Sequence, residues 1–231
     1  MLRFENVLLR QGQFQLCADW AFPRSGRLAI LGPSGAGKSS LLSAVAGFLD
    51  PFRGRISWET ERIDDQPPAK RPVTILFQDH NLFGHLTAAQ NVALGLDPSL
   101  KLNAEQTQRV DEALDRVGLR SYADRKPAAL SGGQQGRVAL ARALIRDRAL
   151  WLLDEPFSAL GPGLRREMLS LVSEMAENSG ATVLMVTHDP DDAVRFADYT
   201  VFVKNGVAHA PAMTVELFAD PPEELRTYLG I

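Results

Sequence analysis

The sequence predicts an α/β fold with a mostly parallel sheet and a helical insertion in its middle. Short apolar runs of strand length alternate with segments in which apolar residues recur at helical spacing. From about Thr87 to Asp147 the strand signal is weak and helical spacing dominates. Strands that alternate with helices usually form a parallel sheet covered on both faces, so the helical stretch is expected to be an insertion.

The N-terminal part is expected to begin with strands. Leu2 to Phe22 is predicted as two short strands with a polar break at Gln11-Gly12-Gln13. Leu28 to Leu31 is an apolar run of buried-strand length that Gly32-Pro33 stops. A helix is expected from about Gly37 to Phe48, with Leu41, Leu42, Val45 and Phe48 on one face, followed by strands at Ile56–Trp58 and Val73–Phe77.

The middle and the end of the chain supply the remaining elements. Asn103 and Ser131 are predicted N-caps of two helices, because short polar side chains bind the free amides of a first turn. The tail from Pro211 to Ile231 is expected to form short helices without a separate core. Helices are predicted at Ala89–Leu96, Val110–Val117 and Val138–Ile145, and strands at Leu150–Leu153, Thr182–Val186 and Tyr199–Val203.

Composition limits the classes of protein. The net charge is −3, with 25 basic and 28 acidic residues and no basic block, so nucleic acid is not an expected partner. Cys17 is the only cysteine, which rules out an intrachain disulfide and fits a reducing compartment. The N-terminus lacks the features of a signal peptide, and no apolar run approaches the ~18 residues that a membrane span needs. Any membrane role is therefore expected to depend on a partner.

A phosphate-binding loop follows the third predicted strand. The run from Gly32 to Ser39 matches the pattern G-x-x-x-x-G-K-[ST] between a buried strand and a helix. Its amides would face phosphate, Lys38 would contact the β- and γ-phosphates, and the Ser39 hydroxyl would bind Mg²⁺. The residues predicted to bind nucleotide here are Gly32, Pro33, Ser34, Gly35, Ala36, Gly37, Lys38, Ser39 and Ser40.

Two carboxylates end a later strand. Leu150 to Leu153 is apolar and runs into Asp154 and Glu155. An aspartate at such a strand end fits a Mg²⁺ ligand, and Glu155 could polarise an attacking water. Together with the phosphate-binding loop, this arrangement indicates either a nucleotide hydrolase or a kinase.

The run Leu130-Ser131-Gly132-Gly133-Gln134 resembles the signature motif of ABC transporter ATPases. It lies between the phosphate-binding loop and Asp154, in the order that this family has. Ser131 would cap a helix whose first amides are left bare by two glycines, which makes a second anion site. Ser131, Gly132, Gly133 and Gln134 are therefore predicted nucleotide-binding residues.

Other positions match the same family. Gln78 resembles its Q-loop glutamine, which contacts Mg²⁺ and water, and His188 resembles the histidine near the γ-phosphate. Ser158-Ala159-Leu160 resembles the D-loop. The resemblance extends from Phe4 to about Gly206 and implies a P-loop NTPase core with N-terminal antiparallel strands and an inserted helical subdomain. It implies a single domain over 1–231, with the core at 1–86 and 148–231 and the helical subdomain at 87–147.

The resemblance also implies a mechanism that needs two copies of the chain. ATP, with Mg²⁺, would lie between the phosphate-binding loop of one copy and the signature motif of the other. The predicted catalytic residues are Glu155 as the base, His188 to orient phosphate and water, and Gln78, with Ser39, Gln78 and Asp154 as metal ligands. ATP would hold the dimer closed, and hydrolysis would let it open.

Three positions depart from the family pattern. No aromatic residue occurs in the window from Leu8 to Gln13 where the family stacks one on adenine, and Phe14 is expected to be a strand core residue. Comparable affinity for ATP and GTP is therefore expected. Gly161 replaces the usual D-loop aspartate, and Gly136 weakens the signature helix by about 1 kcal/mol relative to alanine. An active but slow or loosely coupled enzyme is expected.

The segment from Lys70 to Asn103 is similar to the ATP-binding subunits of thiamine importers. Importers of iron, sulfate or polyamines remain alternatives, and ABC ATPases outside transport and a P-loop kinase are less favoured. The resemblance implies transmembrane permease subunits as partners, a periplasmic substrate-binding protein as an indirect partner, and a peripheral position on the cytoplasmic face of the bacterial inner membrane. Phe83 and Leu86 are the predicted permease contacts.

Overall fold

The computed structural model describes residues 1–77, 79, 81–158 and 160–231. Within them, eleven strands form a sheet in the order β5-β4-β1-β2-β10-β9-β3-β8-β7-β6, and β11 pairs with β9. The strands are β1 (Leu2–Gln11), β2 (Phe14–Phe22), β3 (Arg27–Leu31), β4 (Arg53–Trp58), β5 (Glu61–Arg62), β6 (Val73–Leu76), β7 (Leu150–Asp154), β8 (Thr182–Val186), β9 (Tyr199–Lys204), β10 (Val207–Ala208) and β11 (Ala212–Met213).

The sheet has a parallel and an antiparallel part. β9, β3, β8, β7 and β6 are neighbours and pair in parallel. β1 pairs antiparallel with β2 and with β4, and β4 pairs antiparallel with β5. The predicted α/β fold with a mostly parallel core sheet and antiparallel N-terminal strands is confirmed. The short strands β5, β10 and β11 were not expected, because two residues carry too little periodicity to be recognised.

Alternating side chains give the parallel sheet two buried faces. In β7, Leu150 and Leu152 join the core that also contains α1 (Lys38–Ala46) and residues of β1 and β2. Trp151 and Leu153 join the core on the other face, with residues of α4 (Gly132–Leu144), α5 (Pro162–Ser179) and α6 (Pro190–Phe196). Because side chains alternate along a strand, a wholly apolar run is what a sheet covered on both faces requires.

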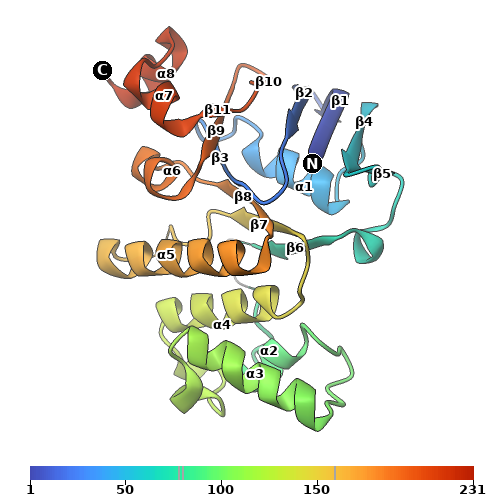
Figure 1. Ribbon diagram of the computed structural model, residues 1–231, viewed down its shortest axis with the longest axis vertical. Coiled ribbons are helices and arrows are strands. Elements are labelled where there is room, and N and C mark those ends of the chain that lie inside the picture. The colour runs from blue at the N-terminus through green and yellow to red at the C-terminus, as the bar shows by residue number, and fades with distance from the viewer. Residues whose placement is uncertain (78, 80, 159) are drawn as a thin grey trace.

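The predicted helical insertion is present. α2 (Ala88–Ala93), α3 (Ala104–Arg116) and α4 share a core cluster, and in Figure 1 they occupy the lower end of the view, away from β1 and β2. Asn103 and Ser131 cap α3 and α4 through reciprocal capping boxes, so both predicted N-caps are confirmed. α4 also packs against the sheet. The limits of this subdomain at 87 and 147 remain a prediction.

Short helices complete the chain. α7 (Thr214–Ala219) and α8 (Glu223–Leu229) follow the last strands, as predicted for the tail. Residues of both helices pack against Leu31 and Phe202, so the tail extends the core of the sheet. Three 3₁₀ turns lie at Pro68–Lys70, Arg120–Tyr122 and Pro127–Ala129. In the part of the chain that the structure describes, no helix combines the length and the hydropathy of a membrane span.

The end of α1 differs from the prediction. The helix stops at Ala46, because Gly47 takes a left-handed conformation with φ 91°. The buried Arg71 donates to the carbonyls of Ala44 (2.7 Å) and Val45 (3.0 Å). A side chain at position 47 would meet its guanidinium, since a Cβ there would lie 2.7 Å from Cζ. Phe48 therefore lies outside the helix and is 59% exposed, contrary to its predicted place on the apolar face.

Candidate nucleotide-hydrolysis site

The carboxyl ends of the neighbouring strands β3, β7 and β8 meet at one edge of the sheet. Gly32 follows β3, Asp154 ends β7 opposite Val186, and His188 follows β8. In open α/β sheets this edge is where ligands bind. The phosphate-binding loop is thereby brought to the strand-end carboxylates and to His188, which lie more than 100 residues further along the sequence.

Two glycines let the loop pass close to its surroundings. Gly32 has φ 154°, and a Cβ there would lie 2.2 Å from the carbonyl oxygen of Val203. Gly37 has φ 100°, and a Cβ there would lie 2.4 Å from Cζ of Phe14. Only glycine fits both conditions without displacing the backbone or the ring. The loop is thus shaped by β9 and by the start of β2 as well as by its own sequence.

Lys38 is buried under this loop. Its ammonium donates to the carbonyls of Gly32 (2.8 Å) and Pro33 (2.9 Å), and only 6% of the residue is exposed. Burial lowers the pKa of Lys38, while the charges of Glu155 and Asp154 act in the opposite direction. The amine is therefore held as a donor at the entry of the loop, close to where the loop amides would meet phosphate.

Ser39 and Asp154 form the candidate metal site. The Ser39 hydroxyl donates to Oδ1 of Asp154 over 3.0 Å. Burial raises the pKa of Asp154 most strongly and the Glu155 charge adds to the rise, whereas the Ser39 hydrogen bond and Lys38 oppose it. A hydroxyl and one carboxylate are oxygen ligands of the kind that Mg²⁺ takes together with substrate phosphates, so the residues present fit this ion.

Glu155 and His188 are in direct contact. Oε2 of Glu155 lies 3.0 Å from Nδ1 of His188, with 21% and 53% of the two side chains exposed. Glu155 has a positive φ of 45°, and its amide donates to the carbonyl of Val186 (3.1 Å), which aims it towards the loop after β8. A carboxylate paired with an imidazole at the edge of a phosphate-binding loop can accept a proton from water and orient it.

The loop after β8 depends on residues that the sequence alone did not single out. Thr187 donates through its hydroxyl to the buried Asp192 (3.0 Å), and Arg165 from α5 pairs with Asp192 and with Asp189 (2.9 Å). The Tyr228 hydroxyl donates to the carbonyl of His188 (2.6 Å). The two aspartates after Pro190 are a recognisable signal for the start of a helix. The sequence does not indicate that Arg165 in α5 is the residue that pairs with Asp192.

The signature residues lie at the start of α4, whose N-cap is Ser131. They are not part of the strand ends that carry the phosphate-binding loop and the carboxylates. Ser131 accepts from the amide of Gln134 (3.3 Å), and the Gln134 side chain accepts from the amide of Ser131 (2.9 Å). A Cβ on Gly133 would meet Leu164 at 2.9 Å, so α5 packs closely there. Among the described residues, no hydrogen bond or ion pair joins Ser131–Gln134 to the phosphate-binding loop.

The remaining predicted positions have separate outcomes. Gln78, predicted as a catalytic residue and metal ligand, lies outside the described residues, as does Ala159 of the D-loop. Phe14 is half-buried against the core and against Gly37, as expected of a strand residue. At the hairpin where the family places an aromatic, Gln11 accepts from the hydroxyl of Ser40 (3.2 Å).

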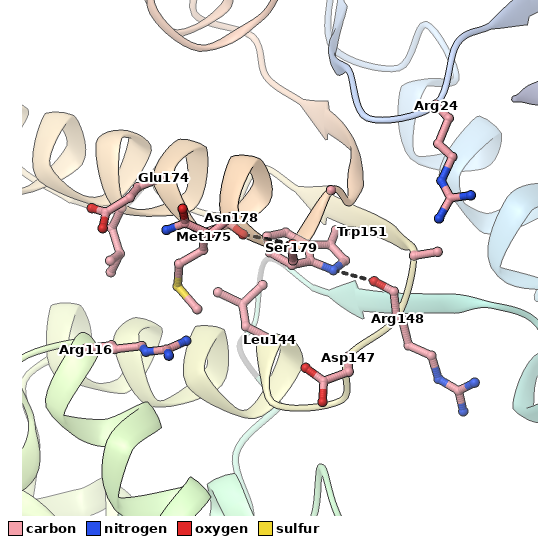
Figure 2. A pocket seen from close by; sticks show the side chains of 13 residues that line it. Arg24, Arg116, Leu144, Asp147, Arg148, Trp151, Glu174, Met175, Asn178 and Ser179 are labelled. Atoms are coloured by element: carbon pink, nitrogen blue, oxygen red, sulfur yellow. Dashed lines mark hydrogen bonds between the residues drawn. The ribbon is translucent and has the colours of Figure 1, made fainter.

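A cavity of about 760 Å³ lies at another place (Figure 2). Arg116, Leu144, Arg148 and Met175 are among the side chains around it, and residues of the phosphate-binding loop are not. The carboxyl ends of α4 and α5 meet there, and cationic side chains complement such helix ends. The cavity lies apart from the phosphate-binding loop and carries no assignment.

Comparison with known proteins identifies a matching family model and proteins of similar sequence. A family model described as "ABC transporter" matches residues 18–158, more than half of the chain. The chain is 56% identical over 230 residues, covering 100% of both chains, to the thiamine import ATP-binding protein ThiQ of Cereibacter sphaeroides. It is 50% identical, with the same coverage, to the protein of that name from Ruegeria sp..

Solved structures agree with these relatives. The dimeric structure of the ATP-binding cassette MJ0796 in a post-hydrolysis state, bound to ADP and Pi, superposes with a TM-score of 0.82. The two chains are 29% identical, and the match covers 93% of this chain and 99% of that one. A second dimeric structure of MJ0796, a bacterial ABC transporter cassette, gives a TM-score of 0.81 at 30% identity.

Proposed function

The chain belongs to the ABC transporter family of ATPases, and from this premise we propose that it powers the import of thiamine or its phosphates through a separate permease. The proposed cargo is supported by the 56% identity with a thiamine import ATP-binding protein over the full length of both chains. ATP hydrolysis follows from the family, and the cassette fold agrees with it.

The geometry at the strand ends supports a division of roles in hydrolysis. Lys38 and the loop amides would bind the phosphates of ATP, and Glu155 would accept the proton of the attacking water. His188, hydrogen-bonded to Glu155, would keep the carboxylate and the water in line with the γ-phosphate. Ser39 and Asp154 would hold Mg²⁺, which supplies charge neutralisation at the β- and γ-phosphates when bound.

A second copy of the chain would complete the nucleotide site. The self-dimer is supported by the dimeric cassettes that this chain resembles. Ser131 to Gln134 would contact ATP across that dimer, head to tail, which agrees with the exposure of Ser131 and Gly132. The periplasmic substrate-binding protein, and a position on the cytoplasmic face of the inner membrane, belong to the same proposal.

The loop before α2 is the proposed contact with the permease. Phe83 is 49% exposed with its ring against His85, and Leu86 is half-buried. Asn91, fully buried, organises this loop: its Oδ1 accepts from the amide of Phe83 (2.8 Å). Its Nδ2 donates to the carbonyls of Phe83 (3.1 Å), Leu86 (3.3 Å) and Thr87 (3.0 Å). An exposed aromatic on a loop fixed from inside is a suitable anchor for a partner.

Cargo is tested by reconstituting the chain with the permease that co-purifies with it. ATPase activity is measured while binding protein is added with thiamine, thiamine diphosphate, ferric ion, sulfate or a polyamine. Stimulation by thiamine or its diphosphate alone would support the proposal. Stimulation by another cargo would overturn the cargo and leave the ATPase intact, and high activity without any co-purifying permease would contradict the transporter role.

A further inference from the structure

The C-terminal helix reaches the catalytic edge of the sheet. The hydroxyl of Tyr228, in α8, donates to the carbonyl oxygen of His188 over 2.6 Å. The imidazole of the same histidine contacts Glu155. A residue near the end of the chain is therefore one hydrogen bond away from the pair to which hydrolysis is assigned.

The position of Tyr228 is fixed by packing. Its ring lies against Phe202 of β9, with 5.7 Å between centroids. Leu225, one turn earlier in α8, is fully buried in a cluster with Leu31 and Phe202. Arg226 holds the start of the helix through the carbonyl of Pro221 (2.7 Å). Since Leu31 directly precedes Gly32, α8 is anchored on the strand that carries the phosphate-binding loop.

The other residues of the loop after β8 have separate supports. The amide of Thr187 donates to the carbonyl of Ile30 (3.2 Å), and the amide of Asp189 donates to Oγ1 of Thr187 (3.1 Å). Within the described part of the chain, the Tyr228 hydroxyl is the only donor that reaches the carbonyl of His188. The His188 side chain is 53% exposed, so packing does not set its orientation.

We propose that Tyr228 is a positioning residue for ATP hydrolysis, whose hydroxyl fixes the backbone at His188 and so keeps the imidazole in contact with Glu155. This inference rests on the roles proposed for His188 and Glu155, and it is independent of the cargo. Burial, with the nearby charges of Asp189 and Glu155, raises the pKa of Tyr228, so the hydroxyl keeps its proton at neutral pH.

Tyr228→Phe removes the hydroxyl and keeps the ring. For the isolated chain we expect kcat for ATP hydrolysis to fall about three- to tenfold, as loss of one hydrogen bond acting in the transition state would produce, with KM for ATP unchanged. Tyr199→Phe is the matched control, because Tyr199 is also half-buried and its hydroxyl makes no hydrogen bond to the loop after β8 among the described residues. That variant is expected to keep the wild-type kcat.

Introducing Tyr228→Phe into a His188→Ala variant distinguishes an effect on the position of His188 from a general loss of structure. In His188→Ala, Tyr228→Phe is expected to add no further loss of kcat, measured by single turnover with labelled ATP, because both changes act through one contact. An equal further loss in that background would overturn the proposal, and so would an unchanged kcat in Tyr228→Phe alone.

NMR of the histidine side chains tests the position of His188 without measuring ATP hydrolysis. The His188 imidazole signal, assigned by its loss in His188→Ala, is expected to shift in Tyr228→Phe and to stay in place in Tyr199→Phe. An unmoved His188 signal would overturn the proposal even if activity had fallen. Wild-type turnover in Glu155→Gln would instead show that the proposed hydrolysis site is wrong, so the two failures are distinguishable.

Discussion

At the level of single residues, Glu155 is the proposed base for ATP hydrolysis. Its carboxylate contacts His188 and lies one residue after Asp154, yet it takes no part in the Ser39 contact. Glu155→Gln should therefore leave the phosphate and metal ligands in place while removing the base. We expect hydrolysis to fall by at least about 100-fold, with ATP binding retained and a closed dimer accumulating. Size-exclusion chromatography with ATP and a phosphate-release assay check this; turnover near that of the wild type would contradict it.

The negative charge of Asp154, the proposed Mg²⁺ ligand, lowers the stability of the folded chain. Its pKa is raised, chiefly by burial, so the folded state binds more protons than the unfolded state above the ordinary aspartate pKa. The contribution of this group to stability is fully present at low pH and is lost as the pH rises through the raised pKa. The ionised form, which is the form proposed to bind Mg²⁺, is therefore the destabilising one.

Asp154→Asn should remove the destabilising negative charge and, with it, the proposed Mg²⁺ ligand. Without nucleotide, we expect the variant to melt at a higher temperature than the wild type at neutral pH, with the difference shrinking as the pH is lowered towards the ordinary aspartate pKa. Mg²⁺-dependent hydrolysis should be lost. Calorimetry over a pH series with an ATPase assay measures both; a variant that melts below the wild type at neutral pH would refute the argument.

At the level of elements, the loop between β6 and α2 depends on one buried amide. Asn91 makes four hydrogen bonds to the backbone of residues 83, 86 and 87. Thr87 in turn starts α2 with a capping box. The loop that carries Phe83 is therefore held by α2, and α2 contacts α4, the helix of the signature motif. Packed helices therefore connect the loop of Phe83 with the helix of the signature motif.

Asn91→Ala is expected to loosen this loop while leaving the hydrolysis residues intact. The lost hydrogen bonds should lower the free energy of unfolding by about 1–3 kcal/mol. Stimulation of ATPase activity by the permease should be lost while basal activity stays. Asn103→Ala is the control: it removes the cap of α3, at a cost of about 1 kcal/mol, without touching the loop. Equal loss of stimulation in both variants would mean that instability alone explains the effect.

At the level of the whole molecule, the two proposed halves of the nucleotide site lie in different parts of the chain. The phosphate-binding loop follows β3 in the sheet, and the signature residues start α4 in the helical part. In the described part of the chain, no hydrogen bond joins them. Two copies in a head-to-tail dimer would bring each half to its complement, as the dimeric cassettes suggest.

Mixing two inactive variants tests this arrangement. Lys38→Ala removes the loop amine and Ser131→Arg blocks the signature motif, so each variant alone should be inactive. In a mixed head-to-tail dimer, one of the two sites combines an intact loop with an intact signature motif. We therefore expect the mixture to recover part of the wild-type ATPase activity. A mixture as inactive as its components would contradict the shared site.

The fold class could be predicted from the sequence alone, and the phosphate-binding loop could be recognised there by its pattern. Apolar runs of strand length, helical spacing and the glycine–lysine–serine pattern are local signals, because each comes from neighbours in the chain. The N-caps Asn103 and Ser131 could be predicted for the same reason. The thiamine subfamily was likewise indicated by a contiguous segment, and whole-length relatives agree with it.

The contacts between residues that are distant in the sequence could be identified only in the tertiary structure. Arg71 donates from another segment to the last carbonyls of α1, and the buried amide of Asn91 donates to and accepts from the backbone of the loop before α2. Tyr228 meets His188 because α8 packs on Leu31 and Phe202. A buried polar side chain must find hydrogen-bond partners, but which partners it finds depends on where the core brings the chain together, and periodicity along the sequence does not encode that.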